Sequence, residues 1–168
     1  MQLIHKIQSR LKHSKSNSDL HGEVFTPFPL IEEMLSTIPE DHLKDPSKTY
    51  FDPCAGKGNF QAVLVEKLML ALTDHFPDEQ ERYKHIMENQ IYMAEYQKQS
   101  AMDIEIVFNP DRKLKLNMYV GDSLLMPDEF FDLPFEQRIL RYPQHYVWGN
   151  LPDKLRPKPG KPFIQPLF

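Results

Sequence analysis

One stretch constrains the fold more than any other: a short strand, a glycine-containing turn and a long helix in succession. Residues 49–51 form a β-prone run that ends at Asp52-Pro53, and the apolar spacing of residues 60–72 predicts a helix. Between them, Gly56 and Gly58 let the backbone turn tightly and approach a ligand, because no Cβ intrudes. This order is typical of the opening of a βαβ unit.

Three later segments are predicted as strands, and each ends next to a short polar residue. They cover residues 90–95, 116–120 and 146–148, and their polar residues are Glu95, Asp122 and Asn150. In open parallel sheets, ligands bind beyond the carboxyl ends of the strands. These polar side chains are therefore expected to share one end of the molecule.

The remaining segments complete an α/β pattern. A helix is predicted from Pro27 to about Ile38 with Thr26 as its N-cap, and another within residues 74–89, whereas residues 39–48 are predicted as a loop. Alternating strands and helices predict an α/β fold, with a mostly parallel sheet of about four strands flanked by helices.

Composition and cysteine usage narrow the class of protein. With 40% hydrophobic and 26% charged residues, the 168-residue chain suits one globular domain. The apolar stretch 62–72 is interrupted by Glu66 and Lys67, so no membrane span is expected. A single cysteine, Cys54, cannot form an intrachain disulfide, which favours a cytoplasmic location. The seven histidines lack the spacing of metal ligands, so no metal site is predicted.

Charge is distributed unevenly along the chain. Residues 1–18 and 154–168 each hold four Lys or Arg and no acid, which leaves 12 basic residues against 24 acidic ones between them. Either the basic ends touch phosphate or they are simply solvated, and charge alone leaves both interpretations open. The predicted organisation is a basic helix and linker (1–21), a central domain (22–151) and a proline-rich basic tail (152–168).

Two motifs carry a resemblance to a known family. The run D-P-C-A-G-K-G-N-F at 52–60 resembles motif I of the S-adenosylmethionine-dependent DNA amino-methyltransferases, whose pattern is D-P-x-x-G-x-G-x-F. Upstream, G-E-V-F-T-P at 22–27 resembles their motif X. The resemblance extends from residue 22 to about 150. It implies a Rossmann-like methyltransferase fold, S-adenosyl-L-methionine as cofactor and DNA as partner.

The resemblance also implies roles for individual residues. Thr26 and neighbouring Phe25 would contact the methionine end of the cofactor, and Asp52, beside Pro53, would reach its amino group. Gly56 and Gly58 would give the cofactor room. Glu95 would accept hydrogen bonds from the ribose hydroxyls and Asp122 from the adenine amino group; the alternatives are a solvated strand-end acid for Glu95 and a plain turn for Asp122. Phe60 would line the adenine pocket or pack in the core.

The catalytic motif departs from the family pattern. Adenine-N6 enzymes carry [DN]-P-P-[YFW], whereas this chain has Asn150, Leu151, Pro152 and Asp153. Asn150 and the Leu151 carbonyl would accept from the amino group of a flipped-out adenine. Asp153 cannot stack on a base, and such stacking is worth about 1–3 kcal/mol.

Two functions therefore stay open: methyl transfer to adenine N6 in DNA, or a non-catalytic, truncated or split module that binds the cofactor and a partner chain. Only 18 residues follow Asn150, so the sheet is expected to be incomplete at its C-terminal edge. An open strand edge favours self-association or a second subunit.

Overall fold

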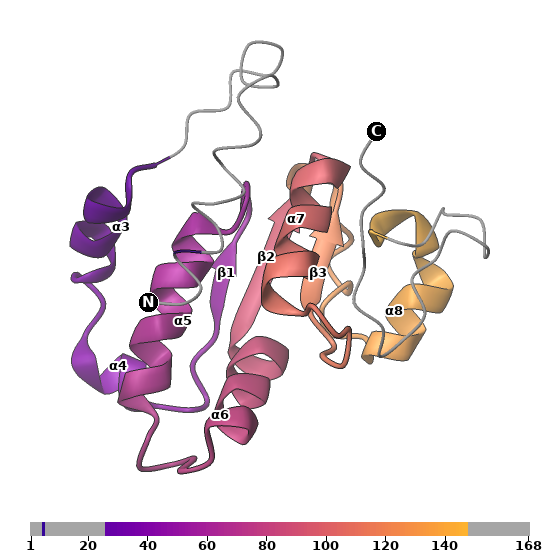
Figure 1. Ribbon diagram of the computed structural model, residues 1–168. Coiled ribbons are helices and arrows are strands. Elements are labelled where there is room, and N and C mark those ends of the chain that lie inside the picture. The colour runs from indigo at the N-terminus through magenta and orange to yellow at the C-terminus, as the bar shows by residue number, and fades with distance from the viewer. Residues whose placement is uncertain (1–4, 6–25, 148–168) are drawn as a thin grey trace.

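The computed structural model describes residue 5 and residues 26–147 (Figure 1). Within them, three strands form one parallel sheet in the order β1-β2-β3. The strands are β1 (Tyr50–Asp52), β2 (Ile91–Glu95) and β3 (Asn117–Val120). Phe51 lies opposite Tyr92, and Met93 lies opposite Met118. The predicted α/β class and the parallel sheet are confirmed, with three described strands.

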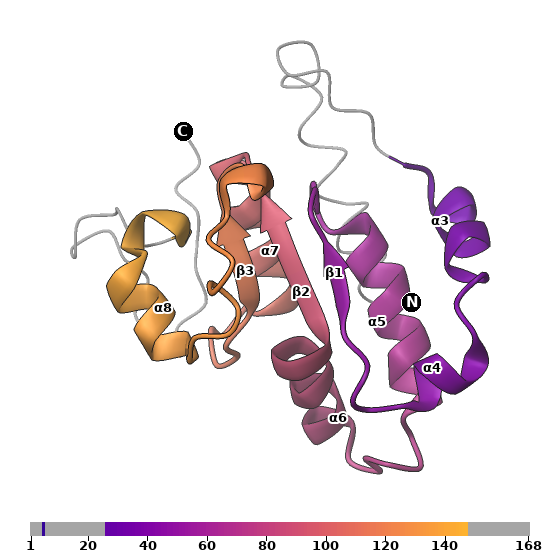
Figure 2. The ribbon, with the colours of Figure 1, turned by 180° about the vertical axis from the view of Figure 1, so that it is seen from behind.

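Helices connect and cover the strands. Their bounds are α3 (Phe28–Leu35), α4 (Glu40–Lys44), α5 (Asn59–Ala71), α6 (Glu79–His85), the π-helical turn η1 (Ile86–Gln90), α7 (Lys98–Phe108), the 3-10 turn η2 (Ser123–Leu125), α8 (Phe135–Arg141) and the 3-10 turn η3 (Pro143–His145). Because β1, β2 and β3 follow one another in space, right-handed crossovers place α5 and α7 on the same face of the sheet. Figure 1 shows α7 in front of β3, and Figure 2 shows it behind. Helix α3 packs against α5 as an outer layer.

The main core lies between this face of the sheet and helices α5 and α7. Ile91, Met93, Met118 and Val120 point into it from alternate strand positions, and residues of both helices complete it. Met87 of η1 is also fully buried there. Burying each side chain of this size contributes about 1.5–3 kcal/mol, so this core positions the strand ends.

An aromatic cluster covers the other face of the sheet beside β3. Tyr119 is buried there, with Phe130 edge-on at 4.9 Å and His145 stacked at 4.4 Å between ring centroids. Arg138 of α8, 6% exposed, donates from Nη2 to Asn117 Oδ1 at 2.9 Å and lies against the Phe130 ring. Helix α8 is therefore held to the sheet by polar and aromatic contacts together.

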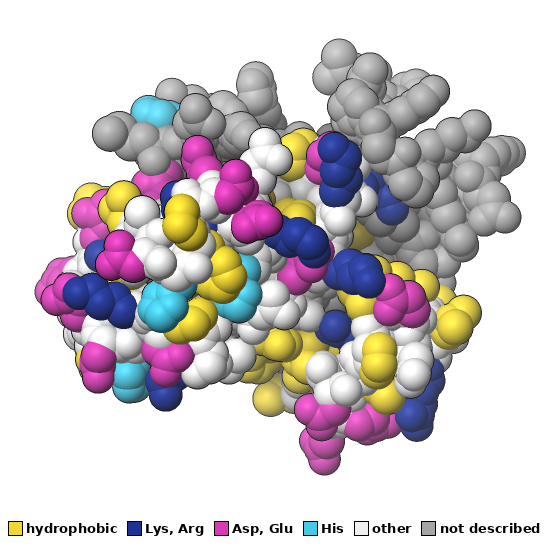
Figure 3. Space-filling model, turned by 90° about the horizontal axis from the view of Figure 1, so that it is seen from below, with side chains coloured by type: hydrophobic (Ala, Val, Ile, Leu, Met, Phe, Trp, Pro, Cys, Tyr) yellow, Lys and Arg dark blue, Asp and Glu magenta, His cyan; other side chains and the backbone are white. Residues whose placement is uncertain are grey.

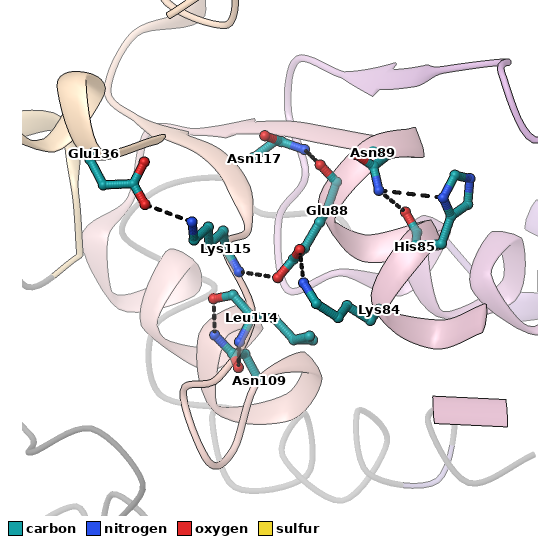
Figure 4. Close-up of polar contacts among 9 residues, drawn as sticks. All are labelled: Lys84, His85, Glu88, Asn89, Asn109, Leu114, Lys115, Asn117 and Glu136. Carbon is teal, nitrogen blue, oxygen red and sulfur yellow. Dashed lines mark hydrogen bonds and ion pairs between the residues drawn. The ribbon is translucent and has the colours of Figure 1, made fainter. Parts of the chain in front are cut away.

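Side-chain hydrogen bonds fasten the start of β3 (Figure 4). Asn117 donates to the carbonyl of Glu88, and the Glu88 carboxylate accepts from the amide of Lys115 at 3.0 Å. Asn109 both donates to and accepts from the backbone of Leu114, at 2.9 Å each. These bonds link the end of α7 and the η1 turn to the strand that follows.

Figure 3 shows the end of the molecule at which the strands begin. Acidic and basic side chains are interspersed on it. No single-sign patch is therefore visible on this face. Among the helices that the structure describes, none has the length and apolar character needed to cross a bilayer.

Several sequence predictions need correction. Pro27, not Thr26, is the N-cap of α3, because the Pro27 carbonyl accepts from the amides of Leu30 and Ile31. The predicted loop 39–48 contains the short helix α4. Tyr146 and Val147, predicted to begin a strand, form a bend and a turn instead.

Tertiary contacts explain why Tyr146 and Val147 do not form a strand. His145 contacts the Val120 carbonyl through Nδ1 at 2.9 Å, and the Tyr146 ring packs edge-on against Phe135. Because of these contacts, residues 146–147 pass over the side of β3 and do not pair with it as a further strand. Helices α7 and α8 were not predicted. The basic helix within 1–21, Trp148 and the tail 152–168 lie outside the described residues.

Candidate cofactor-binding site

The turn after β1 is organised around the carboxylate of Asp52. Asp52 Oδ1 accepts from the Cys54 amide at 3.0 Å, which closes the first part of the turn. Its Oδ2 accepts from Gln61 Nε2 at 2.8 Å, across the first turn of α5. Both oxygens are thus oriented by the protein, and each keeps a lone pair for a further donor.

The same turn is tied to the end of β2. The Ala55 amide donates to the Ala94 carbonyl at 3.0 Å, and the Gly56 amide donates to Glu95 Oε2 at 2.7 Å. Glu95 Oε1 accepts from the Gln97 amide, also at 2.7 Å. Hydrogen bonds to an ionised acceptor are roughly twice as strong as neutral ones. The buried Glu95 carboxylate therefore shapes the turn from the neighbouring strand.

The two glycines of the turn are needed for different reasons. Both have a positive φ, +56° at Gly56 and +86° at Gly58, a backbone region that side chains disfavour. At Gly56, a Cβ would meet no atom within 4 Å. At Gly58, a Cβ would lie 2.7 Å from the ring of Phe108. Gly58 thus permits close packing of α5 on α7, and Gly56 leaves space open.

A cavity of about 420 Å³ lies beside this turn, between β1, α3 and α5. Five of the predicted cofactor-binding residues line it: Thr26, Asp52, Pro53, Gly56 and Phe60. Phe60 also packs against the main core, and its contact with the adenine of a cofactor stays a prediction. The other lining residues are Leu35, Ile38, Tyr50, Phe51, Cys54, Ala55, Lys57, Asn59, Gln61, Leu64, Ile91 and Tyr92.

Two buried amide side chains in this wall were missed by sequence reasoning. Gln61 is 3% exposed and Asn59 is 7% exposed. Gln61 Oε1 and Asn59 Oδ1 have no hydrogen-bond partner, and Asn59 Nδ2 reaches the Thr26 carbonyl only at 3.5 Å. Two amide side chains among the mainly apolar residues at the start of α5 were the available signal.

Other predicted residues lie outside this cavity. Asp122 follows β3 and caps the η2 turn by accepting from the Leu124 amide at 3.0 Å. Glu95 and Gly58 support the turn from behind and do not line the cavity. Phe25 and the tetrapeptide Asn150, Leu151, Pro152 and Asp153 lie outside the described residues. Their assigned roles stay predictions.

A second cavity of about 410 Å³ lies between the end of α7, the start of β3 and α8. Glu105 lines it, and burial raises the pKa of this carboxyl to about 7, against opposing effects of the Asn109 hydrogen bond and Arg112. The cavity lies at the amino end of β3, away from the turn at 52–58. Among the described residues, no three His, Cys, Asp or Glu side chains are grouped to hold a metal ion.

The fold and the first cavity together define a class. A parallel sheet with flanking helices and a cavity at the carboxyl end of a strand is consistent with a Rossmann-like fold.

Similarity to known proteins is local. No protein-family model matches the chain. Over 75 residues the chain is 37% identical to an uncharacterised adenine-specific methylase of Mycoplasma pneumoniae, a stretch that covers 43% of this chain and 18% of that protein. This partial similarity supports a methyltransferase family, and the matched stretch spans less than a fifth of the relative's length.

Proposed function

We propose that the protein binds S-adenosylmethionine beside the turn at residues 52–58 and acts as a methyltransferase of the DNA adenine-N6 type. The observation that carries the proposal is the cavity at the end of β1. The motif that resembles that of the methyltransferases supplies two parts of its wall there, the Asp52 carboxylate and Gly56, beside which space is open. The local similarity to an adenine-specific methylase supports the same class.

The cavity suits this cofactor in size and chemistry. Its volume of about 420 Å³ falls within the roughly 300–1,000 Å³ of small-molecule sites. Asp52 can accept from an ammonium group, because its two oxygens together offer about four acceptor positions and two are used. Gly56 leaves its surroundings open, and Phe60 adds apolar wall. When bound, the cofactor supplies a methyl group activated by a sulfonium.

Glu95 and Asp122 have different roles in the proposal, and a different observation supports each role. Glu95 accepts two backbone amides and so keeps the turn in place, and the family resemblance assigns it the ribose hydroxyls of the cofactor. Asp122 lies at the end of β3, the neighbouring strand, where the family resemblance places an acceptor for the adenine amino group. Neither contact is needed for the role of Asp52.

The transfer step rests on Asn150 and the Leu151 carbonyl. In the proposed reaction they accept hydrogen bonds from the target amino group and thereby orient its lone pair toward the methyl group. Asp153 takes the place of the aromatic residue that would stack on the base. This departure favours a second candidate, a module that binds the cofactor and a partner chain without catalysing transfer.

Two measurements test the proposal in sequence. Isothermal titration with S-adenosylmethionine and S-adenosylhomocysteine should show saturable binding, and its absence at millimolar ligand would overturn the central claim. The second measurement follows labelled methyl into duplex DNA and separates the digested nucleosides. Label in N6-methyl-2′-deoxyadenosine supports the enzyme, whereas binding without transfer to DNA supports the module.

A further inference from the structure

The contact between Asp52 and Gln61 leaves a half-buried carboxylate that forms no ion pair with the described residues. Gln61 is 3% exposed, lines the first cavity and donates from Nε2 to Asp52 Oδ2 at 2.8 Å. No lysine or arginine of the described residues forms an ion pair with Asp52. A neutral amide orients the carboxylate without balancing its charge, whereas a lysine at this position would balance it.

Directing the Gln61 amide to Asp52 has an energetic cost, because the oxygen of the same amide stays unpaired. With Nε2 directed to Asp52, Oε1 is buried and has no hydrogen-bond partner. Leaving a buried acceptor unpaired costs about 1–3 kcal/mol, and such groups in folded proteins call for a functional or structural reason. A leucine or methionine here would avoid that cost, so packing alone does not account for a glutamine.

Gln90 provides a comparison within the same protein. It is also fully buried with an unpaired Oε1, but its Nε2 donates to two carbonyls, those of Asp45 and Lys48. Gln90 therefore fastens a loop and does not line the first cavity. Of these two buried glutamines, Gln61 is the one that directs its amide to a carboxylate in the wall of the first cavity.

We infer that Gln61 is a positioning residue that makes the first cavity selective for ligands carrying an ammonium group. It holds the Asp52 carboxylate toward the cavity and leaves its charge to be balanced by the ligand. This inference rests on the proposed function, because it takes the amino-acid end of S-adenosylmethionine or its demethylated product as that ammonium. It adds a residue and a selection rule that the motif at 52–60 does not contain.

The test compares two ligands on full-length wild-type and variant proteins by isothermal titration. The ligands are S-adenosylhomocysteine and an analogue with hydrogen in place of the α-ammonium group. Wild type should prefer the amine at least about tenfold. Gln61→Met should reduce this preference severalfold, because Asp52 loses its orienting donor, and Gln61→Lys should abolish it, because a cation then neutralises Asp52. The matched control Gln90→Met should lower stability and keep the preference.

A wild-type measurement covers the case in which the variants do not fold. The side-chain amide NMR signals of Gln61 should shift on addition of the amine ligand and stay in place with the deaminated analogue. If wild type binds both ligands equally, the inference is overturned and the proposed function stands. Retained preference in both Gln61 variants, or an unmoved Gln61 signal, also overturns it. Failure of wild type to bind either ligand overturns both proposals.

Discussion

The close contact between Gly58 and Phe108 allows a quantitative test of how the turn is built. Gly58 and Gly56 both have left-handed backbone conformations, so replacing either with alanine costs about 1–2 kcal/mol in backbone strain. Only at Gly58 would the new Cβ lie 2.7 Å from the Phe108 ring. Phe108 is fully buried, so the ring cannot move aside without disturbing the core, and overpacking costs about 1–3 kcal/mol more.

We therefore expect Gly58→Ala to lower the free energy of unfolding by about 2–5 kcal/mol and Gly56→Ala by about 1–2 kcal/mol. The entropy that alanine removes from the unfolded chain is common to both variants and cancels in the difference. Urea denaturation followed by circular dichroism measures both values. The double variant Gly58→Ala with Phe108→Leu should be less destabilised than the sum of the single changes, because leucine removes the ring edge.

Equal destabilisation of the two glycine variants would refute this reasoning. So would strict additivity in the double variant, since the contact between residues 58 and 108 would then carry no energy of its own. A change in the denaturant slope of one variant would signal an altered unfolded or native state, and that variant would be compared by its midpoint only.

Three further predictions concern binding, pH and association. Asp52→Ala should weaken S-adenosylhomocysteine binding at least about tenfold, or roughly 1.4 kcal/mol, by titration calorimetry, and unchanged affinity would remove Asp52 from the site. Because the pKa of Glu105 is raised from 4.5 to about 7, the folded chain keeps a proton that the unfolded chain loses, so stability falls as pH rises through this window. The variant Glu105→Gln keeps an acceptor for Asn109. Its free energy of unfolding in urea should exceed that of wild type by about 1–2 kcal/mol at pH 8 but not at pH 4. Equal stability of the two proteins at both pH values would contradict the raised pKa. Finally, if residues 157–168 cover an edge or contact a second subunit, their deletion should change stability or the mass measured by light scattering, whereas an unchanged monomer would count against both roles.

The site illustrates what residue patterns can and cannot predict. Asp52, Pro53, Gly56 and Phe60 were found from one motif, because a turn between a strand and a helix is determined by neighbouring residues. Gln61 was missed, since nothing in the pattern of α5 distinguishes a glutamine that faces a carboxylate from one that faces solvent. Its role depends on a side-chain bond across nine positions.

The sequence alone determined the α/β class, the three described strands and the long helix after the turn, because periodicity and turn residues act over a few positions. Tertiary structure decided the rest. It placed Glu95 under the Gly56 amide and Phe108 against Gly58, contacts that span 39 and 50 positions. It also packed the ring of Tyr146 against Phe135, so this residue does not form the predicted strand. Such contacts depend on how helices and strands pack together, a property that short-range patterns do not encode.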